Sequence, residues 1–181
     1  MTIADLNIPT LETGRLILRS HRLEDFDACV AIWQDPVVRK HFHGPGLTRE
    51  DIWGRFLRGF GMWAVMGYGA WAVEEKETGN YIGTVGVFEV RRDMMPNMEG
   101  TPEAGWTIAA HAHGQGYATE AGRAALDWVD EKLSHPRTFC IVAPENRPSI
   151  RVAEKLGFRP AGETTYKDEP TLVFLRERQK R

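Results

Sequence analysis

His111-Ala-His-Gly-Gln-Gly-Tyr-Ala-Thr-Glu-Ala121 carries more structural information than any other stretch of this chain. The apolar run before it, residues 104–110, predicts a strand, and residues 117–133 have the pattern of a helix. Gly114 and Gly116 lie between the two, and glycine lets the main chain turn tightly enough for several backbone N–H groups to converge. The N-terminus of the following helix adds unpaired donors and the positive end of its dipole. The order strand, glycine loop, helix therefore predicts a phosphate or pyrophosphate site.

The glycine spacing narrows the choice of ligand. A Rossmann loop would need a third glycine where Thr119 stands, and a P-loop would need Gly-Lys-Ser/Thr, which this chain lacks. The absence of both patterns argues against an unrelated α/β nucleotide-binding protein. The remaining arrangement, H-x-x-G-x-G over residues 111–116, resembles the Q/R-x-x-G-x-G/A motif of the GNAT superfamily of acyl-CoA-dependent N-acyltransferases. His111 replaces the usual Gln or Arg, which could weaken a side-chain contact to phosphate.

A second motif supports this resemblance independently. The apolar run Thr138-Phe-Cys-Ile-Val-Ala143 predicts a buried strand. Residues 144–158 then predict a helix, with Pro148 suited to its first turn and Gly157 to its C-terminal cap. Their N-x-x-S-x-x-x-x-E-K-L-G-F pattern is similar to the later GNAT motif, in which an Asn and a helix flank the pantetheine arm. The recognisable core therefore spans residues 103–158.

The rest of the chain agrees with this resemblance. Residues 11–19, L-x-T-x-R-L-x-L-R, resemble the branch that includes the ribosomal-protein-alanine N-acetyltransferases and predict a strand. The other expected elements are helices at 24–34 and 49–65, strands at 70–75 and 81–90, and a closing hairpin of 162–166 with 171–176. The resemblance implies an α/β (α+β) GNAT fold: a mixed central sheet of about seven strands, helices on both faces, and a splayed strand pair that holds the cofactor. We expect one domain over residues 1–181.

Composition limits the possible partners. The net charge of −2 gives no basic field for nucleic-acid binding. Neither a signal-peptide core nor a long uncharged apolar span is present, so we expect a cytoplasmic protein that does not bind membranes. Cys29 and Cys140 are expected to be reduced core thiols rather than a disulfide.

The resemblance implies a set of residues that bind acetyl-CoA, the expected co-substrate. A backbone amide near Ile108 would polarise the thioester carbonyl, and the glycine loop would hold the pyrophosphate. The expected cofactor-binding residues are Ile108, Ala109, Ala110, His111, His113, Gly114, Gln115, Gly116, Tyr117, Ala118, Thr119 and Asn146.

Two residues are candidates for proton transfer. Glu103 begins the strand that leads to the glycine loop and is the preferred general base, although a solvated acidic residue at a strand start is an equal alternative. Glu99 is a weaker substitute. Ser149 is the candidate acid for the leaving thiolate, although a hydroxyl in a first helical turn also suits N-capping. Tyr166 is the alternative acid, but its position favours a plain strand residue.

Four histidines raise the possibility of a metal site. His41, His43, His111 and His113 form two His-x-His pairs, but without nearby carboxylate clusters or Cys partners, so no metal is expected. Phe42 and His43, between the first two helices, are expected to line the entrance for the acceptor.

The predicted function is acetyl-CoA-dependent N-acetylation of a primary amine by direct attack in a ternary complex. The acceptor is a peptide or protein N-terminus or a small-molecule amine, and its choice is expected to depend on loops 39–49 and 91–101. The alternative is a non-catalytic acyl-CoA-binding sensor or regulatory module of the same fold. A homodimer is possible, because similar proteins commonly form one.

Overall fold

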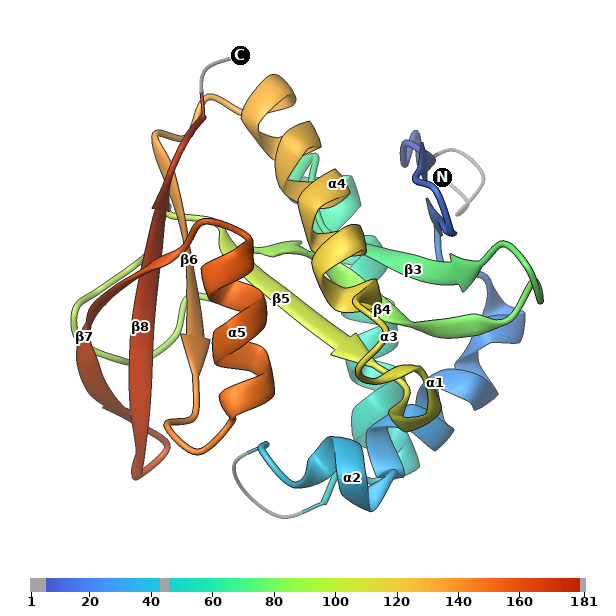
Figure 1. Cartoon of the computed structure of the whole chain (residues 1–181), viewed down its shortest axis with the longest axis horizontal. Helices are drawn as coiled ribbons and strands as arrows, with labels where there is room; N and C mark the ends of the chain where they lie inside the picture. Colours follow the sequence, from blue (N-terminus) through green and yellow to red (C-terminus); the bar gives the residue numbers. More distant parts are fainter. Residues whose placement is uncertain (1–5, 43–45, 180–181) are drawn as a thin grey trace.

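The computed structural model describes residues 6–42 and 46–179 of the chain. Within these residues, eight strands form one sheet in the order β1-β2-β3-β4-β5-β6-β8-β7 (Figure 1). The strands are β1 (Leu11–Glu12), β2 (Leu16–Arg19), β3 (Ala70–Glu75), β4 (Tyr81–Phe88), β5 (Glu103–Ile108), β6 (Arg137–Val142), β7 (Arg159–Tyr166) and β8 (Glu169–Glu177). Only β5 and β6 run parallel, and every other neighbouring pair is antiparallel.

Helices cover both faces of this sheet. In Figure 1, α4 and α5 cross the near face and α3 lies behind. The helices are α1 (Phe26–Gln34), α2 (Pro36–Arg39), α3 (Arg49–Met66), α4 (Tyr117–Lys132) and α5 (Arg147–Lys155), with short 3-10 turns η2 (Leu23–Asp25) and η3 (Ala110–Ala112). The predicted mixed sheet with helices on both faces is therefore confirmed.

The opening segment differs from the expected single strand, which is why the sheet has eight strands rather than about seven. The Thr13 backbone N–H donates to the Leu16 carbonyl at 3.0 Å, and the Leu16 N–H donates to Thr13 Oγ1 at 2.9 Å. These bonds close a turn that divides the segment. β1 folds back antiparallel on β2, with Leu11 opposite Leu18. A side-chain-capped turn of this kind gives no strong sequence signal, because Thr also suits strands.

Helix α3 runs one residue beyond its predicted end. Thr48 and Asp51 form a capping box at its start, and Gly67, with φ of 72°, ends it in the left-handed conformation. Gly59 and Gly61 lie inside the helix, and an added Cβ at either would meet no atom within 4 Å. The apolar face of α3 packs against α1, so burial outweighs the weak helix propensity of glycine.

The sheet faces are buried in separate apolar clusters. One joins β2 to β5 with α4 and includes Trp71 and Ala121, both fully buried. A second joins α4 and α5 to β6 and β8, around Phe158 and Ala153. A third lies between α1 and α3. Together these clusters fix α4 and α5 against the sheet, and therefore the N-terminal ends of both helices.

Two expectations from composition can be compared with the structure. Cys29 and Cys140 are both free and buried, as predicted. In residues 6–42 and 46–179, no helix is both long enough and apolar enough to cross a membrane.

Strands β5 and β6 open into a gap at the centre of the sheet. Their one register pair is Glu103 with Phe139, where the Phe139 N–H donates to the Pro102 carbonyl at 3.1 Å. Beyond this point the two strands diverge toward their carboxyl ends (Figure 1). The splayed pair expected from the resemblance is therefore present. It leaves main-chain groups of both strands without a strand partner, which an extended ligand could satisfy.

Candidate functional site

The glycine loop follows β5 and ends at the N-terminus of α4. Gly114 and Gly116 have φ of 76° and 83°, a left-handed conformation that glycine adopts without strain. Gly116 is the N-cap of α4, and no side chain caps this end. The first backbone N–H groups of a 16-residue helix are therefore available to an external acceptor. The loop and the uncapped helix end therefore have the geometry that the predicted anion site requires.

Arg15 supports this loop from the neighbouring strand hairpin. Its guanidinium donates to the Gln115 carbonyl at 3.0 Å, forms an ion pair with Glu120 at 2.6 Å, and lies 4.4 Å from the Tyr117 ring centroid. Tyr117 itself is buried and donates from its hydroxyl to Glu75. The predicted Tyr117 is therefore a residue that fixes the loop, and Arg15 is a supporting residue that the motif did not reveal.

Main-chain groups just before the glycines already have hydrogen-bond partners within the protein. The Ala109 N–H donates to the Ile82 carbonyl at 2.8 Å, and the His113 ring nitrogen Nε2 lies 2.8 Å from the Ile108 carbonyl. Ala110, another predicted residue, begins turn η3. His111, the next residue of this turn, is exposed. An N–H donor at Ala109 is thus unavailable to a ligand, and the free donors lie in the predicted residues from the glycines onward: Gly114, Gln115, Gly116, Ala118 and Thr119.

Helix α5 places a serine and an asparagine at the far side of the gap. Asn146 is the N-cap of α5, because its Oδ1 accepts from the Ser149 backbone N–H at 3.2 Å. The capping alternative for Ser149 is therefore wrong: Asn146 fills that role. The Ser149 hydroxyl instead accepts from Trp106 Nε1 at 3.3 Å, across the gap from β5. A hydroxyl that accepts in this way keeps its own proton for another partner.

A cavity of about 400 Å³ joins the predicted catalytic residues. Glu103, Asn146, Ser149 and Tyr166 all line it, although they come from β5, from α5 and its cap, and from β7. The residues of the glycine loop do not line this cavity, so the structure separates the predicted anion site from the predicted proton-transfer site.

Glu103 lines this cavity and is a buried residue rather than a solvated surface residue. Its side chain is 8% exposed, and Arg92 binds both carboxylate oxygens, at 2.6 and 2.7 Å. The Arg92 guanidinium lies 4.7 Å from the ring centroid of Tyr166. Arg92 belongs to the loop after β4 and its partner could not be read from the sequence. Glu99, the weaker candidate base, pairs with Arg91 and does not line the cavity.

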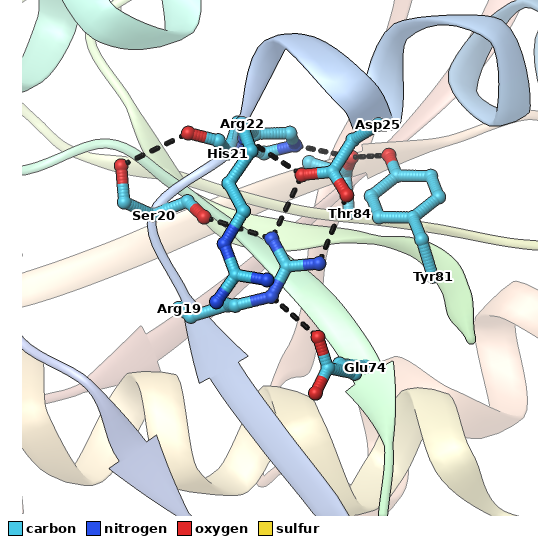
Figure 2. Close-up of polar contacts among 8 residues, drawn as sticks. All are labelled: Arg19, Ser20, His21, Arg22, Asp25, Glu74, Tyr81 and Thr84. Carbon is cyan, nitrogen blue, oxygen red and sulfur yellow. Dashed lines mark hydrogen bonds and ion pairs between the residues drawn. The ribbon is translucent and has the colours of Figure 1, made fainter. Parts of the chain in front are cut away.

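A buried polar cluster forms another wall of the cavity (Figure 2). His21 Nε2 lies 3.1 Å from Thr84 Oγ1, which in turn lies 2.7 Å from the Tyr81 hydroxyl. His21 and Thr84 both line the cavity. Burial lowers the pKa of His21 to about 4, an effect that Asp25 opposes, so the ring is neutral at pH 7. No motif surrounds these residues, and they meet only because β2 and β4 flank β3.

Arg19 holds this cluster in place. It forms a two-point ion pair with Asp25, at 2.7 and 2.9 Å, and a third contact with Glu74 at 2.6 Å (Figure 2). Hydrogen bonds to Asp25 raise the pKa of Arg19, although burial opposes the effect. Both members of the Arg19–Asp25 pair are less than a tenth exposed. The final arginine of the opening motif is therefore a structural residue in this protein.

The segment that follows α2 contributes part of the cavity wall. His41 and Phe42 line the cavity, and the ring centroids of Phe42 and Trp33 are 4.8 Å apart. His43, the other residue expected at the entrance, lies outside the described residues. Within the described ranges, no group of three or more His, Cys, Asp or Glu side chains is arranged to hold a metal ion.

Comparison with known proteins gives a consistent result. A family model described as an acetyltransferase (GNAT) domain matches residues 15–159. The chain is 30% identical to the uncharacterized N-acetyltransferase p20 of Bacillus licheniformis over 154 residues, 84% of each protein. It is also 30% identical to the uncharacterized protein YkkB of Bacillus subtilis (strain 168) over 175 residues, 92% of this chain and 95% of that one. An acetyltransferase structure from Agrobacterium tumefaciens str. C58 superposes with a TM-score of 0.80 at 32% identity, covering 94% of this chain and 95% of that one.

More distant structures share the fold alone. A ribosomal-protein-S5-alanine acetyltransferase from Vibrio fischeri has a TM-score of 0.73 at 18% identity, with 96% of this chain and 98% of that one covered. A spermidine N-acetyltransferase from Vibrio cholerae, in complex with CoA and spermine, has a TM-score of 0.70 at 18% identity, with 92% and 97% covered. The likeness to the ribosomal-protein enzymes inferred from the opening motif thus extends to the whole architecture.

Proposed function

This chain belongs to the GNAT family of acetyltransferases, and on that basis we propose that it transfers the acetyl group of acetyl-CoA to a primary amine bound in the cavity around Glu103. The whole chain acts as one acetyltransferase domain whose core is residues 103–158. The observation that carries this proposal is the gap between β5 and β6, which pair at Glu103 and Phe139 and then diverge.

The gap and the glycine loop fit the two ends of a coenzyme A molecule. The uncapped N-terminus of α4 offers backbone donors for the pyrophosphate. Unpaired main-chain groups of the diverging strands suit the amides of the pantetheine arm. His111 is exposed beside the loop and can contact a phosphate oxygen, whereas His113 orients the loop through Ile108.

Acetyl transfer needs two proton movements. The amine nitrogen bonds to the acetyl carbon and loses a proton, and the carbon–sulfur bond breaks to leave a thiolate that gains one. We assign the second proton to Ser149. Because its oxygen already accepts from Trp106, its own O–H is free to point into the cavity toward the sulfur.

Glu103 is our proposed acceptor of the proton from the amine. Arg92 occupies one lone pair on each carboxylate oxygen, and a carboxylate has about four such positions, so further positions remain for the amine or a bridging water. The same ion pair fixes the direction of the carboxylate. If instead the pair is only structural, the protein would bind acyl-CoA without transferring it, which is the sensor alternative.

Substitution at the two proposed catalytic residues tests this assignment. Glu103→Gln keeps the shape of the side chain and is expected to lower kcat at least 100-fold, within the range for loss of a general base, with the Kd for acetyl-CoA nearly unchanged. Ser149→Ala is expected to slow thiol release while the Asn146 cap keeps the melting temperature close to that of the native protein.

The matched control for these variants is Glu99→Gln, which removes a carboxylate that does not line the cavity. Full activity of Glu103→Gln would remove Glu103 as the base. A loss of thermal stability in Ser149→Ala, with unchanged turnover, would remove Ser149 as the acid.

A further inference from the structure

The cavity around Glu103 carries an excess of positive charge. Among the described residues, four cationic side chains line it, namely Arg55, Arg58, Arg92 and Lys167, against the single carboxylate of Glu103. Arg55 and Arg58 project from α3, one helical turn apart, and Lys167 follows the end of β7. Helix α3 lies on the face of the sheet opposite α4 (Figure 1).

Among the described residues, Arg92 is the one of these four cations that forms an ion pair, and Arg55 also feels the negative charge of Asp51, four residues before it on α3. Arg92 pairs with Glu103 at 2.6 Å, whereas the ion pairs found in residues 6–42 and 46–179 include neither Arg55 nor Arg58. Arg55 and Arg58 are exposed at the rim of the cavity, where desolvation and the positive charges of Arg58 and Arg92 lower the pKa of Arg55, although Asp51 opposes the effect. The Arg55 guanidinium is therefore repelled by those of Arg58 and Arg92, and a bound anion would relieve that repulsion.

The phosphates of coenzyme A are poorly placed to be this anion. Arg92 binds at Glu103, the first residue of β5, whereas the glycine loop follows Ile108 at the other end of that strand. Five residue steps of a strand span about 17 Å. The arginines are thus at the acceptor end of the cavity, and the anion belongs to the acceptor.

Aromatic side chains complete the same wall. Trp33, Phe56 and Phe88 line the cavity, and the Arg55 guanidinium lies 5.2 Å from the Trp33 ring centroid. A space of about 400 Å³ matches a small ligand with an apolar body rather than a protein surface.

Building on the proposed function, we propose that the acceptor is a small amine with an apolar or aromatic body and an anionic group such as a carboxylate, and that Arg55 and Arg58 bind this group. The amine then lies toward Glu103 and the anion toward α3. A polycation is disfavoured, because it would meet the unpaired guanidinium groups. This assignment differs from the polyamine named for the Vibrio cholerae structure, with which this chain shares the fold alone.

A matched pair of amines tests the charge requirement. We would compare thiol release from acetyl-CoA with 4-(aminomethyl)benzoate, with its neutral amide 4-(aminomethyl)benzamide, and with spermine. The first two differ only in a remote charge, so their amines have similar reactivity. We expect kcat/KM to be at least tenfold higher for the benzoate than for either other amine, as a charge-assisted contact would give.

Variants then assign the preference to particular residues. In the double variant with Arg55→Gln and Arg58→Gln, the ratio of kcat/KM for the benzoate to that for the benzamide is expected to fall close to one, with the Kd for acetyl-CoA unchanged. The double variant with Arg55→Lys and Arg58→Lys keeps the positive charges and should restore part of this ratio. Arg49→Gln is the matched control, because it removes a charge from the same helix outside the cavity and should keep the ratio.

The possible results separate this inference from the proposed function. Equal turnover of the two benzoyl amines, faster turnover of spermine, or a ratio that survives the double variant would each contradict the inference while leaving the transferase intact. If no amine is acetylated and acetyl-CoA fails to bind in calorimetry, the proposed function is wrong, and the inference fails with it.

Discussion

Protonation of His21 is expected to destabilise the fold in mild acid. The ring is 8% exposed and packs edge-on against Phe56, with ring centroids 5.5 Å apart. Its pKa is about 4 in the folded protein, against 6.5 for a fully hydrated histidine such as that of the unfolded chain. Between these values the unfolded chain binds a proton that the folded protein does not, so the free energy of unfolding falls as pH decreases from 6.5 to 4 and levels off below 4.

The size of this effect follows from the two pKa values. A pKa of about 4 in the folded protein against 6.5 in the unfolded chain corresponds to about 3 kcal/mol in full, of which about 2 kcal/mol is lost between pH 7 and pH 4.5. With a urea m-value of about 2 kcal/mol/M, the unfolding midpoint should fall by about 1 M urea. Carboxylates also make the fold sensitive to acid, so the effect of His21 is measured as the difference in pH dependence between the native protein and His21→Gln. In this variant the glutamine amide can replace the contact of His21 Nε2 with Thr84.

Urea unfolding at pH 7 and pH 4.5 would be measured for the native protein, for His21→Gln and for His111→Gln. His111 is exposed and serves as the control. His21→Gln should lose about 2 kcal/mol less between the two pH values, whatever constant cost the substitution has at both. An identical loss in the native protein and His21→Gln would refute the account of a buried, neutral His21.

Two further predictions concern the glycine loop and the core. Gly116→Val should weaken coenzyme A binding more than tenfold in calorimetry, because a β-branched residue is strained at φ of 83° and displaces the loop. Gly79→Val is the control: Gly79 has a similar φ of 71° but lies in the β3–β4 turn, so the affinity for coenzyme A should not change. Asp130→Ala leaves the Arg176 guanidinium, which is 4% exposed, without its carboxylate partner, and should lower the free energy of unfolding in urea by about 3–5 kcal/mol. Asp27→Ala breaks an exposed ion pair and should lower it by less than about 1 kcal/mol.

The parts of the fold that local patterns specify were predictable from the sequence. The glycine loop and the start of α4 depend on residues adjacent in the chain, and Gly114 and Gly116 adopt the conformation that their spacing predicts. The divergence of β5 and β6 came from the resemblance to the family rather than from periodicity. The division of residues 11–19 into two strands depends on one side-chain-capped turn at Thr13, which competes closely with a continuous strand.

The contacts inside the candidate site were less predictable, because they join residues far apart in the chain. Arg92 reaches Glu103 only through the path of the loop after β4, and His21 meets Thr84 only through the order of the strands. Local rules left the roles of Asn146 and Ser149 ambiguous, since both residue types cap helices. The position of Trp106 on β5 resolves this ambiguity by engaging the Ser149 hydroxyl.

The most direct test of the central proposal is to detect the acetylated amine itself. The protein would be incubated with acetyl-CoA and a panel of amino acids, aromatic amino-carboxylates, peptide N-termini, polyamines and aminoglycosides, and each amine would be examined by mass spectrometry while the released thiol is quantified. The account predicts one acetylated amine for each thiol released, dependent on both the protein and the amine. Tight binding of acetyl-CoA with no acetylated amine across the panel would contradict it and favour a protein that binds acyl-CoA without transferring the acetyl group.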